Sequence, residues 1–387
     1  MTAFPIDPSN RVGTLRSSKI REVAEEGMGR DDIIALWFGE GCWKTSDRAV
    51  EIASAALRDG AHFYQSNNGM PVLRQAICDY LNRIYGLKID RPRVTVTSSG
   101  MQGLALAAQV LIDPGDRVVS IEPAWPNLSQ VFRISGGDVE IQSLKPGEGR
   151  WVLDLDELLA RLTADTRAVV INSPNNPTGW ALDLDEARII LTHCRKHGIW
   201  IIADDVYSRL YRGADFAPGI LQVAEPEDRV ISVNSFSKAW SMTGWRLGWL
   251  VTPPELEQPL ATLTEYNIAC APGFVQLAGA EMLRNGEDEV HLLRERLAEA
   301  YEVTARRLSA LNRVTFYAPQ GAFYCFFAVD GMSDSLAFAK KLVKEAGVGL
   351  APGIAFGPMG EGYLRLCYAQ PVDRLEEAFT RLQKAMG

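Results

Sequence analysis

The chain has 387 residues, a formal net charge of -8 and a pI near 5.3. This length allows one large or two medium domains with a substantial core, and the acidic balance disfavours nucleic acid as a main partner. No apolar run is long enough to span a bilayer, and the N-terminal residues lack the hydrophobic core of a signal peptide. We therefore expect a soluble, cytoplasmic protein without nucleic-acid or membrane partners.

The cysteines and histidines give no sign of a metal site or a disulfide framework. The six cysteines are scattered singly, without a CxxC pair or a Cys/His cluster. The four histidines also lack a ligand-like spacing and are expected to be structural or exposed. These patterns predict a reducing compartment and no bound metal.

Strand-like and helix-like runs alternate through the middle of the chain. Short apolar strands separated by helices are typical of an α/β protein with a mostly parallel sheet that is covered on both faces. Ligands bind at the carboxyl ends of the strands in such sheets. The expected strands are 93–97, 117–121, 167–171, 199–203, 229–233 and 245–251, and the helices expected among them are 102–111 and 182–197.

The C-terminal part has a different pattern, which predicts a smaller α+β domain. Residues 287–311 form one long charged amphipathic segment, which is followed by strand-like and shorter helical runs. We place the domain boundary within 281–289 and expect the N-terminal segment to pack with the small domain. The predicted large domain is 46–285, and the predicted small domain combines 1–45 with 286–387.

Polar residues follow several of the expected strands. Gly100, Met101 and Gln102 lie between a strand and a helix start, where backbone amides and the helix dipole can hold a phosphate. Asn176 lies in the turn SPNNPTG, and Asp204 follows an apolar strand, where a buried carboxylate needs a partner. Taken singly, each also fits an ordinary turn, a helix cap or a structural salt bridge.

The segment SFSKAWSMTGWRLGW, residues 235–249, contains a candidate nucleophile. Lys238 lies just past a β-branched strand in a loop rich in hydroxyls, and Arg246 opens the next apolar strand. Such a lysine can form a Schiff base with an aldehyde while Ser235, Ser237 and Arg246 hold a phosphate. Alone, the segment fits a surface loop with a solvated lysine about as well.

A series of motifs along almost the whole chain resembles the class I/II aminotransferases, which are fold-type-I pyridoxal phosphate enzymes. The resemblance implies pyridoxal 5'-phosphate as cofactor and a large domain with a mostly parallel sheet of the seven-stranded type, plus a smaller α+β domain. Each motif is weak or moderate alone, but together they follow the family's order. The motifs are GEGCWKT, YQSNNGMPVLR, SSGMQGLAL, EPAWPNL, SPNNPTG, ADDVYSRL, SFSKAWSMTGWRLGW, PQGAFY and YLRLCYA.

This resemblance implies roles around the cofactor. Lys238 is expected to form the Schiff base and to carry the proton between the α-carbon and the cofactor. Asp204 is expected to pair with the ring nitrogen, and Tyr207 and Asn176 to contact the ring oxygen. Trp125 is expected to stack on the ring. The phosphate contacts implied are Ser235, Arg246 and the backbone of Gly100, Met101 and Gln102.

The resemblance also implies substrate contacts and a shared active site. Arg365 is expected to clamp the α-carboxylate of an amino acid, assisted by Asn176 and the Gly39 backbone. Tyr64 matches a tyrosine that reaches the phosphate of the neighbouring subunit, which implies a homodimer. The implied reaction is ping-pong transfer of an amino group from an L-amino acid to a 2-oxo acid.

The sequence indicates less directly which substrate side chains the site accepts. Acidic-substrate members need a second cation, but no Lys or Arg lies between Arg246 and Arg284, and Met101 replaces a lysine that one subgroup uses. We therefore expect neutral, aromatic or sulfur-containing donors at a site whose mouth is rich in aromatic residues. The alternative is a cation from Lys19, Lys44 or a partner subunit. The aromatic residues expected at the mouth are Trp37, Phe38, Trp43 and Trp125.

Three rival functions are considered: a β-lyase, which is the nearest rival and which the same residues would serve equally, and a regulator and a dehydrogenase, which the sequence disfavours. A carbon–sulfur β-lyase of the same fold would use the same lysine, aspartate and arginine, and would release pyruvate and ammonia without a 2-oxo acid. A regulator that senses pyridoxal phosphate or an amino acid would carry an added DNA-binding domain, whereas the family match begins by about Ile33. A nicotinamide dehydrogenase is disfavoured because no GxGxxG follows a strand.

Overall fold

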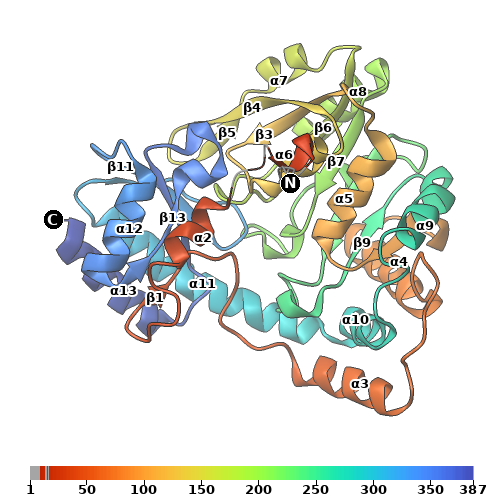
Figure 1. Ribbon diagram of the computed structural model, residues 1–387, viewed down its shortest axis with the longest axis horizontal. Coiled ribbons are helices and arrows are strands. Elements are labelled where there is room, and N and C mark those ends of the chain that lie inside the picture. The colour runs from red at the N-terminus through yellow and green to blue at the C-terminus, as the bar shows by residue number, and fades with distance from the viewer. Residues whose placement is uncertain (1–8, 14, 16, 387) are drawn as a thin grey trace, which may run out of the picture.

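The computed structural model describes residues 9–13, 15 and 17–386, arranged as two lobes that lie side by side (Figure 1). The larger lobe contains the segments from α3 to α10, and the smaller lobe combines α2 and β1 with the C-terminal elements. The predicted domain ranges include residues 1–8, 14, 16 and 387, which lie outside the described part.

Eight strands form the main sheet of the described chain, in the order β2-β9-β8-β7-β6-β3-β4-β5. The neighbours from β8 to β4 are parallel, whereas β9 is antiparallel to both its neighbours and β5 is antiparallel to β4. The mostly parallel α/β sheet is therefore confirmed, and β4 and β5 extend it at one edge beyond the six strands expected from the sequence. The strands are β2 (Val94–Thr97), β3 (Arg117–Glu122), β4 (Asp138–Pro146), β5 (Trp151–Leu153), β6 (Thr166–Asn172), β7 (Trp200–Asp204), β8 (Val230–Ser235) and β9 (Gly248–Val251).

Helices cover both faces of the sheet, and successive residues of each strand point toward opposite faces. Ile201 packs with the core that includes α4, α8 and α10, while Ile202 packs with the core that includes α5, α6 and α9. This explains the continuous apolar runs in the central strands. The helices of this lobe are α3 (Asp47–Arg58), α4 (Pro71–Tyr85), α5 (Gly100–Leu111), α6 (Asn127–Ile134), α7 (Leu155–Arg161), α8 (Leu184–His197), α9 (Glu257–Glu265) and α10 (Gly273–Asn285).

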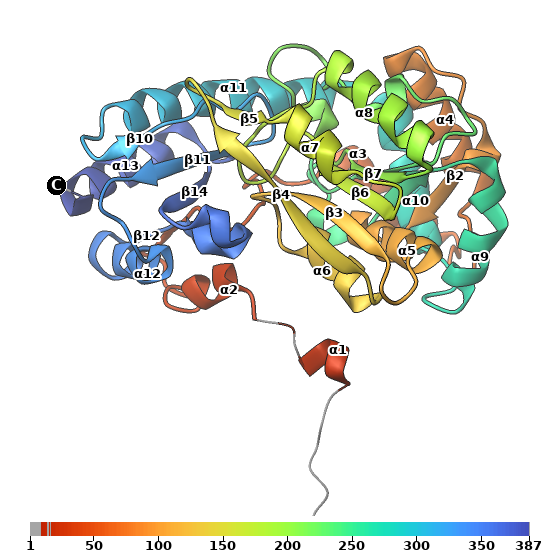
Figure 2. The same cartoon turned by 90° about the horizontal axis from the view of Figure 1, so that it is seen from above.

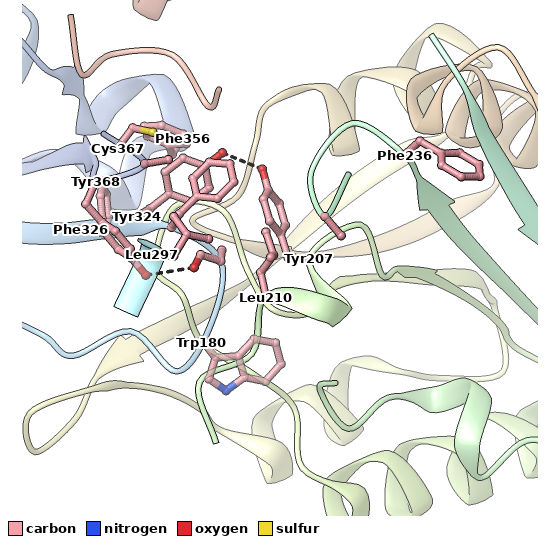
Figure 3. Packing of buried hydrophobic residues seen from close by; sticks show 14 of the residues in the cluster. Trp180, Tyr207, Leu210, Phe236, Leu297, Tyr324, Phe326, Phe356, Cys367 and Tyr368 are labelled. Carbon is pink, nitrogen blue, oxygen red and sulfur yellow. Dashed lines mark hydrogen bonds between the residues drawn. The ribbon is translucent and has the colours of Figure 1, made fainter. Parts of the chain in front are cut away.

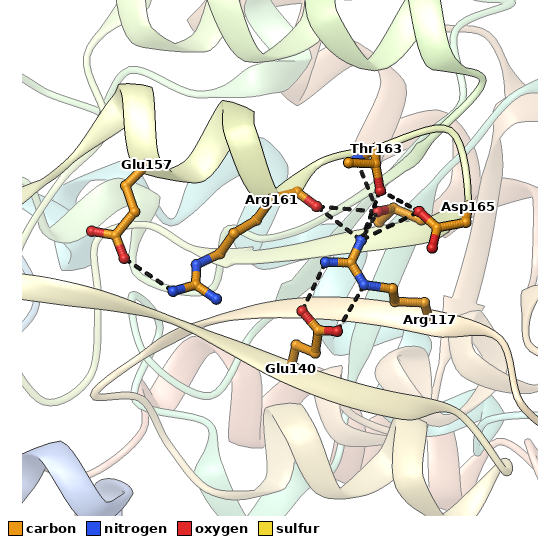
Figure 4. Close-up of polar contacts among 7 residues, drawn as sticks. Arg117, Glu140, Glu157, Arg161, Thr163 and Asp165 are labelled. Atoms are coloured by element: carbon orange, nitrogen blue, oxygen red, sulfur yellow. Dashed lines mark hydrogen bonds and ion pairs between the residues drawn. The ribbon is translucent and has the colours of Figure 1, made fainter.

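Polar contacts tie together the amino-terminal ends of β3, β4 and β6 (Figure 4). The Arg117 guanidinium donates two hydrogen bonds to the Glu140 carboxylate, at 2.8 and 2.7 Å, and one to the Arg161 carbonyl at 2.8 Å. Arg161 in turn donates to Glu157 at 3.1 Å. These contacts fix the strand starts and lie away from the carboxyl ends, where the candidate site is found.

The small lobe is built on a four-stranded antiparallel sheet within the described residues, in the order β10-β11-β14-β13. Strand β1 (Ile34–Ala35) pairs in parallel with β12 (Val348–Gly349), so a segment before the large lobe is held against one that follows it in the sequence. The other elements of this lobe are α2 (Lys19–Ala24), α11 (Glu287–Ser309), α12 (Ser335–Ala346), α13 (Val372–Met386), β10 (Val314–Thr315), β11 (Tyr324–Val329), β13 (Ala351–Pro352) and β14 (Tyr363–Cys367), whereas the short helix α1 (Asn10–Gly13) contacts α6 of the large lobe.

Helix α11 runs along both lobes (Figure 2). Its first residue, Glu287, forms an ion pair with the buried Arg209 of the large lobe, and Arg209 also contacts the Tyr80 hydroxyl. This joins the start of the helix to the main sheet lobe. No helix in the described ranges has the length and apolar character needed to cross a bilayer.

Candidate active site

A cavity of about 420 Å³ lies at the carboxyl ends of β6, β7 and β8, and both lobes contribute to its walls. It brings together residues that are far apart in the sequence. Among the predicted cofactor and substrate contacts, only Gln102 and Tyr64 do not line it, and of the aromatic residues expected at the mouth Trp43 does not, because it lines separate hollows beside it. The predicted residues in the wall are Gly39, Gly100, Met101, Trp125, Asn176, Asp204, Tyr207, Ser235, Lys238, Arg246 and Arg365.

One end of the cavity is formed by the N-terminus of α5. The first amides of a helix have no intrahelical acceptor, and the helix dipole favours an anion there. Ser99 caps the helix with its side chain, which accepts from the Gln102 amide at 3.2 Å, and has φ of 111°. A side chain at Gly248 would overlap the Gly100 nitrogen, so glycine is needed where β9 packs against this helix end.

Hydroxyls and a cation lie beside this helix end. The Ser235 hydroxyl accepts from the Ser237 amide at 3.1 Å and lies 2.9 Å from the Ser237 hydroxyl. Arg246 adopts a left-handed conformation with φ of 55°, which costs energy for a residue other than glycine. Arg246 precedes β9 and lines the cavity. The sequence pattern had placed it at the start of that strand. Together these groups can hold a phosphate.

Lys238 lies half-buried in the cavity wall, and its Nζ donates to the Gly39 carbonyl at 2.6 Å. Burial lowers the pKa of the amine to about 8, and the nearby charge of Arg365 acts in the same direction. Most of the amine is still protonated near physiological pH, but it reaches the neutral state far more easily than an ordinary lysine. The neutral state is the one that a nucleophilic or proton-accepting lysine requires.

Asp204 is a buried carboxyl at the end of β7, only 3% exposed. Its Oδ1 accepts one hydrogen bond, from the Val206 amide at 3.3 Å, and it forms no ion pair with any described residue. Burial raises the pKa of the carboxyl to about 7, against the opposing effects of this bond and of Lys238. A buried carboxyl without a cation fits a partner such as a protonated ring nitrogen.

Arg365 enters the cavity from β14 and is 1% exposed. Its Nη1 donates to Asn176 Oδ1 at 3.1 Å, and its Nη2 donates to the Trp37 carbonyl. Its Nε is buried and has no hydrogen-bond partner among the described residues. A buried guanidinium with an unsatisfied donor favours binding of a carboxylate.

Two hydroxyls meet between the lobes. The Tyr207 hydroxyl lies 2.7 Å from that of Tyr324, and both side chains are buried (Figure 3). Tyr324 lies in the motif PQGAFY, but no pattern in the sequence singled it out as a site residue. Asn172 is a further polar residue at a strand end, because it is the last residue of β6. Its side chain contacts both the end of β7 and the turn that follows β6. Its Nδ2 donates to the Asp204 carbonyl at 3.1 Å, and its Oδ1 accepts from the Asn176 amide at 2.8 Å.

The two predicted residues outside the cavity have other surroundings. The Gln102 amide is bonded to Ser99, and its side chain donates to Asn267 at 3.0 Å. Tyr64 is 87% exposed, so a role for it requires a second chain. Sequence reasoning also missed several residues that tertiary folding brings to the wall. These are Ser18, Ile20, Arg21, Leu104, Asn127, Asn172, Val206, Thr243 and Tyr324.

Comparison with known proteins gives consistent matches over nearly the whole chain. A family model described as aminotransferase class I and II matches residues 33–382. An aspartate aminotransferase of Pyrococcus horikoshii is 35% identical, with 98% of this chain and 97% of that protein covered. An aromatic-amino-acid aminotransferase of Thermococcus litoralis is 31% identical, with 98% of each chain covered. The solved aspartate aminotransferase of Thermus thermophilus with maleate has a TM-score of 0.91 at 31% identity, covering 98% of this chain and 99% of that one.

Proposed function

Because the chain belongs to the class I and II aminotransferases, we propose that the cavity is its active site and that it favours neutral, aromatic or sulfur-containing amino acid donors. The enzyme transfers an amino group from an amino acid to a 2-oxo acid and uses pyridoxal phosphate, as this family does. The residue roles and the donor preference below are our proposals.

Three independent features of the cavity suit the binding of pyridoxal phosphate. The N-terminus of α5, with Ser235 and Arg246, suits the phosphate, and the unpaired buried carboxyl of Asp204 suits the ring nitrogen. Lys238 suits the aldehyde. When bound, the cofactor supplies an aldehyde that bonds amines and a protonated ring that accepts electrons from the α-carbon.

Lys238 is proposed to move the proton. Because its pKa is lowered to about 8, its Nζ can accept the α-proton of the amino acid and release it again without a large energetic cost. The Gly39 carbonyl, which accepts from Nζ at 2.6 Å, keeps the amine on the cavity side. The second half of the reaction uses the same amine in the reverse direction.

Asn176 and Arg365 are proposed to orient the substrate and the ring together. Since Asn176 Oδ1 accepts from Arg365, the Nδ2 of that amide remains as the donor toward the ring oxygen. Arg365 would bind the α-carboxylate through its free Nε and through an Nη. One hydrogen bond thus links the carboxylate clamp to the ring contact.

The observation that carries the donor preference is the apolar lining of the outer cavity. Ile20, Trp37, Phe38 and Met101 lie in its wall, and Trp125 lies beside them. These side chains would bury an apolar substrate side chain favourably. The sequence from 247 to 283 also contains no cation.

A second candidate, the use of acidic substrates, is favoured by Arg21. This residue of α2 lines the cavity, is exposed, and forms no side-chain hydrogen bond or ion pair with a described residue. Lys19, which we considered as the source of a cation, is bonded to Glu22 at 2.8 Å instead and does not line the cavity. Arg21 could pair with a distal carboxylate.

A donor panel with wild-type and Arg21→Met holoenzyme separates the two candidates. We expect kcat/KM for phenylalanine and methionine to exceed that for aspartate by about tenfold or more, since an apolar wall discriminates by about 1–3 kcal/mol. Arg21→Met should lower kcat/KM for aspartate only. A wild-type enzyme that prefers aspartate, and loses this preference in Arg21→Met, would establish the acidic candidate.

We further propose a homodimer with shared active sites in the cytoplasm. Phe63 and Tyr64 are 80% and 87% exposed, which is unusual for adjacent aromatic residues and is consistent with burial against a second copy. All cysteines are unpaired, which suits a reducing compartment. Cell fractionation and sedimentation equilibrium test these two statements.

A further inference from the structure

Tyr324 contacts two groups to which different tasks are assigned above. It is the first residue of β11 and is completely buried. Its hydroxyl lies 2.7 Å from the hydroxyl of Tyr207 (Figure 3). The Arg365 guanidinium lies 4.6 Å from its ring centroid. A single side chain from the small lobe therefore joins the ring-oxygen contact to the carboxylate clamp.

The Tyr324 hydroxyl has space beside Gly39 but few hydrogen-bond partners. A side chain at Gly39 would overlap the Tyr324 hydroxyl, so the glycine makes space for it. Tyr207 is the hydrogen-bond partner of this hydroxyl among the described residues. Burial raises the pKa of both tyrosines well above neutral pH, so each hydroxyl keeps its single proton.

The direction of the hydrogen bond follows from counting protons. Tyr207 lines the cavity, where the ring oxygen would accept its proton. If Tyr324 donates to Tyr207, Tyr207 can donate to the ring oxygen and both tyrosine protons are used, whereas the reverse direction leaves the Tyr324 proton without an acceptor among the described residues. Donors linked in this way polarise each other, so the outer hydroxyl strengthens the inner one.

The ring of Tyr324 has a separate task. The Arg365 guanidinium lies between this ring and that of Phe356, at 4.6 and 4.9 Å from the two centroids. A cation over an aromatic face is attracted by the negative face of the ring, which holds the guanidinium in orientation. Loss of the ring would let the guanidinium turn away from the bound carboxylate.

We propose that Tyr324 is a positioning residue of the transamination site, whose hydroxyl strengthens the Tyr207 donor and whose ring orients Arg365. This inference rests on the proposed roles of Tyr207 and Arg365. It predicts that the two tasks separate experimentally: the hydroxyl controls the pH titration of the bound cofactor, and the ring controls the affinity for substrate carboxylate.

The test compares Tyr324→Phe and Tyr324→Leu holoenzymes with wild type. The Phe variant should raise the midpoint of the cofactor's absorbance titration by about half to one pH unit, because a weaker donor no longer favours the deprotonated ring system. Its KM should stay within about twofold of wild type, since the ring remains. The Leu variant should show the same shift and a KM raised about fivefold or more.

Tyr368→Phe is the matched control. Tyr368 is also buried, and its hydroxyl donates to the Ala322 carbonyl at 3.0 Å, away from the cavity wall. Its substitution should leave both the midpoint and KM unchanged. In a Tyr207→Phe background, adding Tyr324→Phe should cause no further shift, because the chain of donors is already broken.

The outcomes separate this inference from the proposed function. An unchanged or lowered midpoint in Tyr324→Phe, with wild-type transamination intact, overturns the inference alone. A wild-type holoenzyme whose cofactor absorbance does not respond to any amino acid overturns the proposed roles as well. If Tyr324→Leu fails to fold, the Phe variant and its titration midpoint decide by themselves.

Discussion

Asp204 and Lys238 are buried ionisable groups whose pKa values move toward neutral pH from opposite sides. Burial raises the pKa of the carboxyl to about 7 and lowers that of the amine to about 8. Both groups therefore change charge readily where the enzyme works, which is characteristic of catalytic sites. Without the cofactor, the carboxyl lacks a cation and its burial opposes folding.

The unfavourable burial of the Asp204 carboxylate makes the stability of the cofactor-free protein pH-dependent. The folded pKa lies above the usual value of 3.8, so the folded state keeps a proton that the unfolded state releases. Wild-type stability should fall relative to Asp204→Asn as the pH rises from about 4 to about 7, and then stay constant. Urea unfolding of both proteins at pH 5 and pH 8 measures the difference.

Asp205 supplies the control for this comparison. Burial also raises its pKa to about 7, but its carboxylate bonds Ser232 and does not line the cavity. Asp205→Asn should show a similar pH-dependent difference in stability, whereas only Asp204→Asn should weaken cofactor binding. A difference between wild type and Asp204→Asn that is independent of pH would contradict the assigned titration.

At the residue scale, chemical type and position at a strand end predicted much of the site. Asp204, Asn176 and Lys238 could be found because each follows an apolar strand. Arg21 and Tyr324 could not be found in this way. Their places depend on how the small lobe packs against the sheet, and neither lies at the carboxyl end of a strand of the main sheet.

The elements that support the site follow from local sequence where burial dominates. The apolar runs of β6 and β7 placed those strands within a few residues. The helix expected over 182–197 is confirmed as α8, whose start is fixed by a capping box of Asp183 and Glu186. Strand β4 was not predicted, because DVEIQSLKP mixes polar and apolar residues near the edge of the sheet. Strand β9 begins at Gly248 because Arg246 occupies a left-handed turn.

Close packing of β9 against α5 is testable through Gly248. A methyl group there would overlap the Gly100 nitrogen and the Asn234 carbonyl, so Gly248→Ala should displace the helix N-terminus. We expect a loss of about 1–3 kcal/mol in stability and a cofactor Kd raised about tenfold or more. Urea unfolding and cofactor titration measure the two effects.

Gly244→Ala is the matched control, because nothing lies within 4 Å of a side chain at that position. It should leave stability and cofactor affinity unchanged. Binding of pyridoxal, which lacks the phosphate, tests the location of the defect. If Gly248→Ala weakens pyridoxal and pyridoxal phosphate binding equally, the helix N-terminus is not the phosphate site.

At the scale of the whole molecule, the site is completed only where the two lobes meet. Arg365 and Tyr324 come from the small lobe, whereas Asp204 and Lys238 come from the large one. The pairing of β1 with β12 brings the Trp37 carbonyl to Arg365. Substrate orientation therefore depends on the relative position of the lobes.

The proposed homodimer adds a second chain to each site through Tyr64. A dimer of Lys238→Ala chains should not be fully active. A dimer of Tyr64→Phe chains should not be fully active when the cofactor concentration is limiting. Mixed subunits should regain activity, because one site of each hybrid would combine native Lys238 with native Tyr64 from the other chain. Tyr266→Phe, equally exposed at 87%, should not show this behaviour unless it also contacts the partner's site.

An absence of recovery in subunit mixtures that demonstrably exchange would contradict the shared site. Sedimentation equilibrium should also give twice the chain mass of 42.7 kDa. A monomer with full activity would contradict the proposed assembly directly.

The role of Lys238 is tested most directly by a single-turnover measurement. Wild-type and Lys238→Ala holoenzymes are mixed rapidly with a preferred amino acid, and conversion of the cofactor from its pyridoxal to its pyridoxamine form is followed by absorbance. We predict rapid conversion of one cofactor per chain in wild type and a rate lower by about 10²–10⁴ in Lys238→Ala, the usual contribution of a positioned base. Conversion of Lys238→Ala at the wild-type rate would contradict the assignment of this lysine.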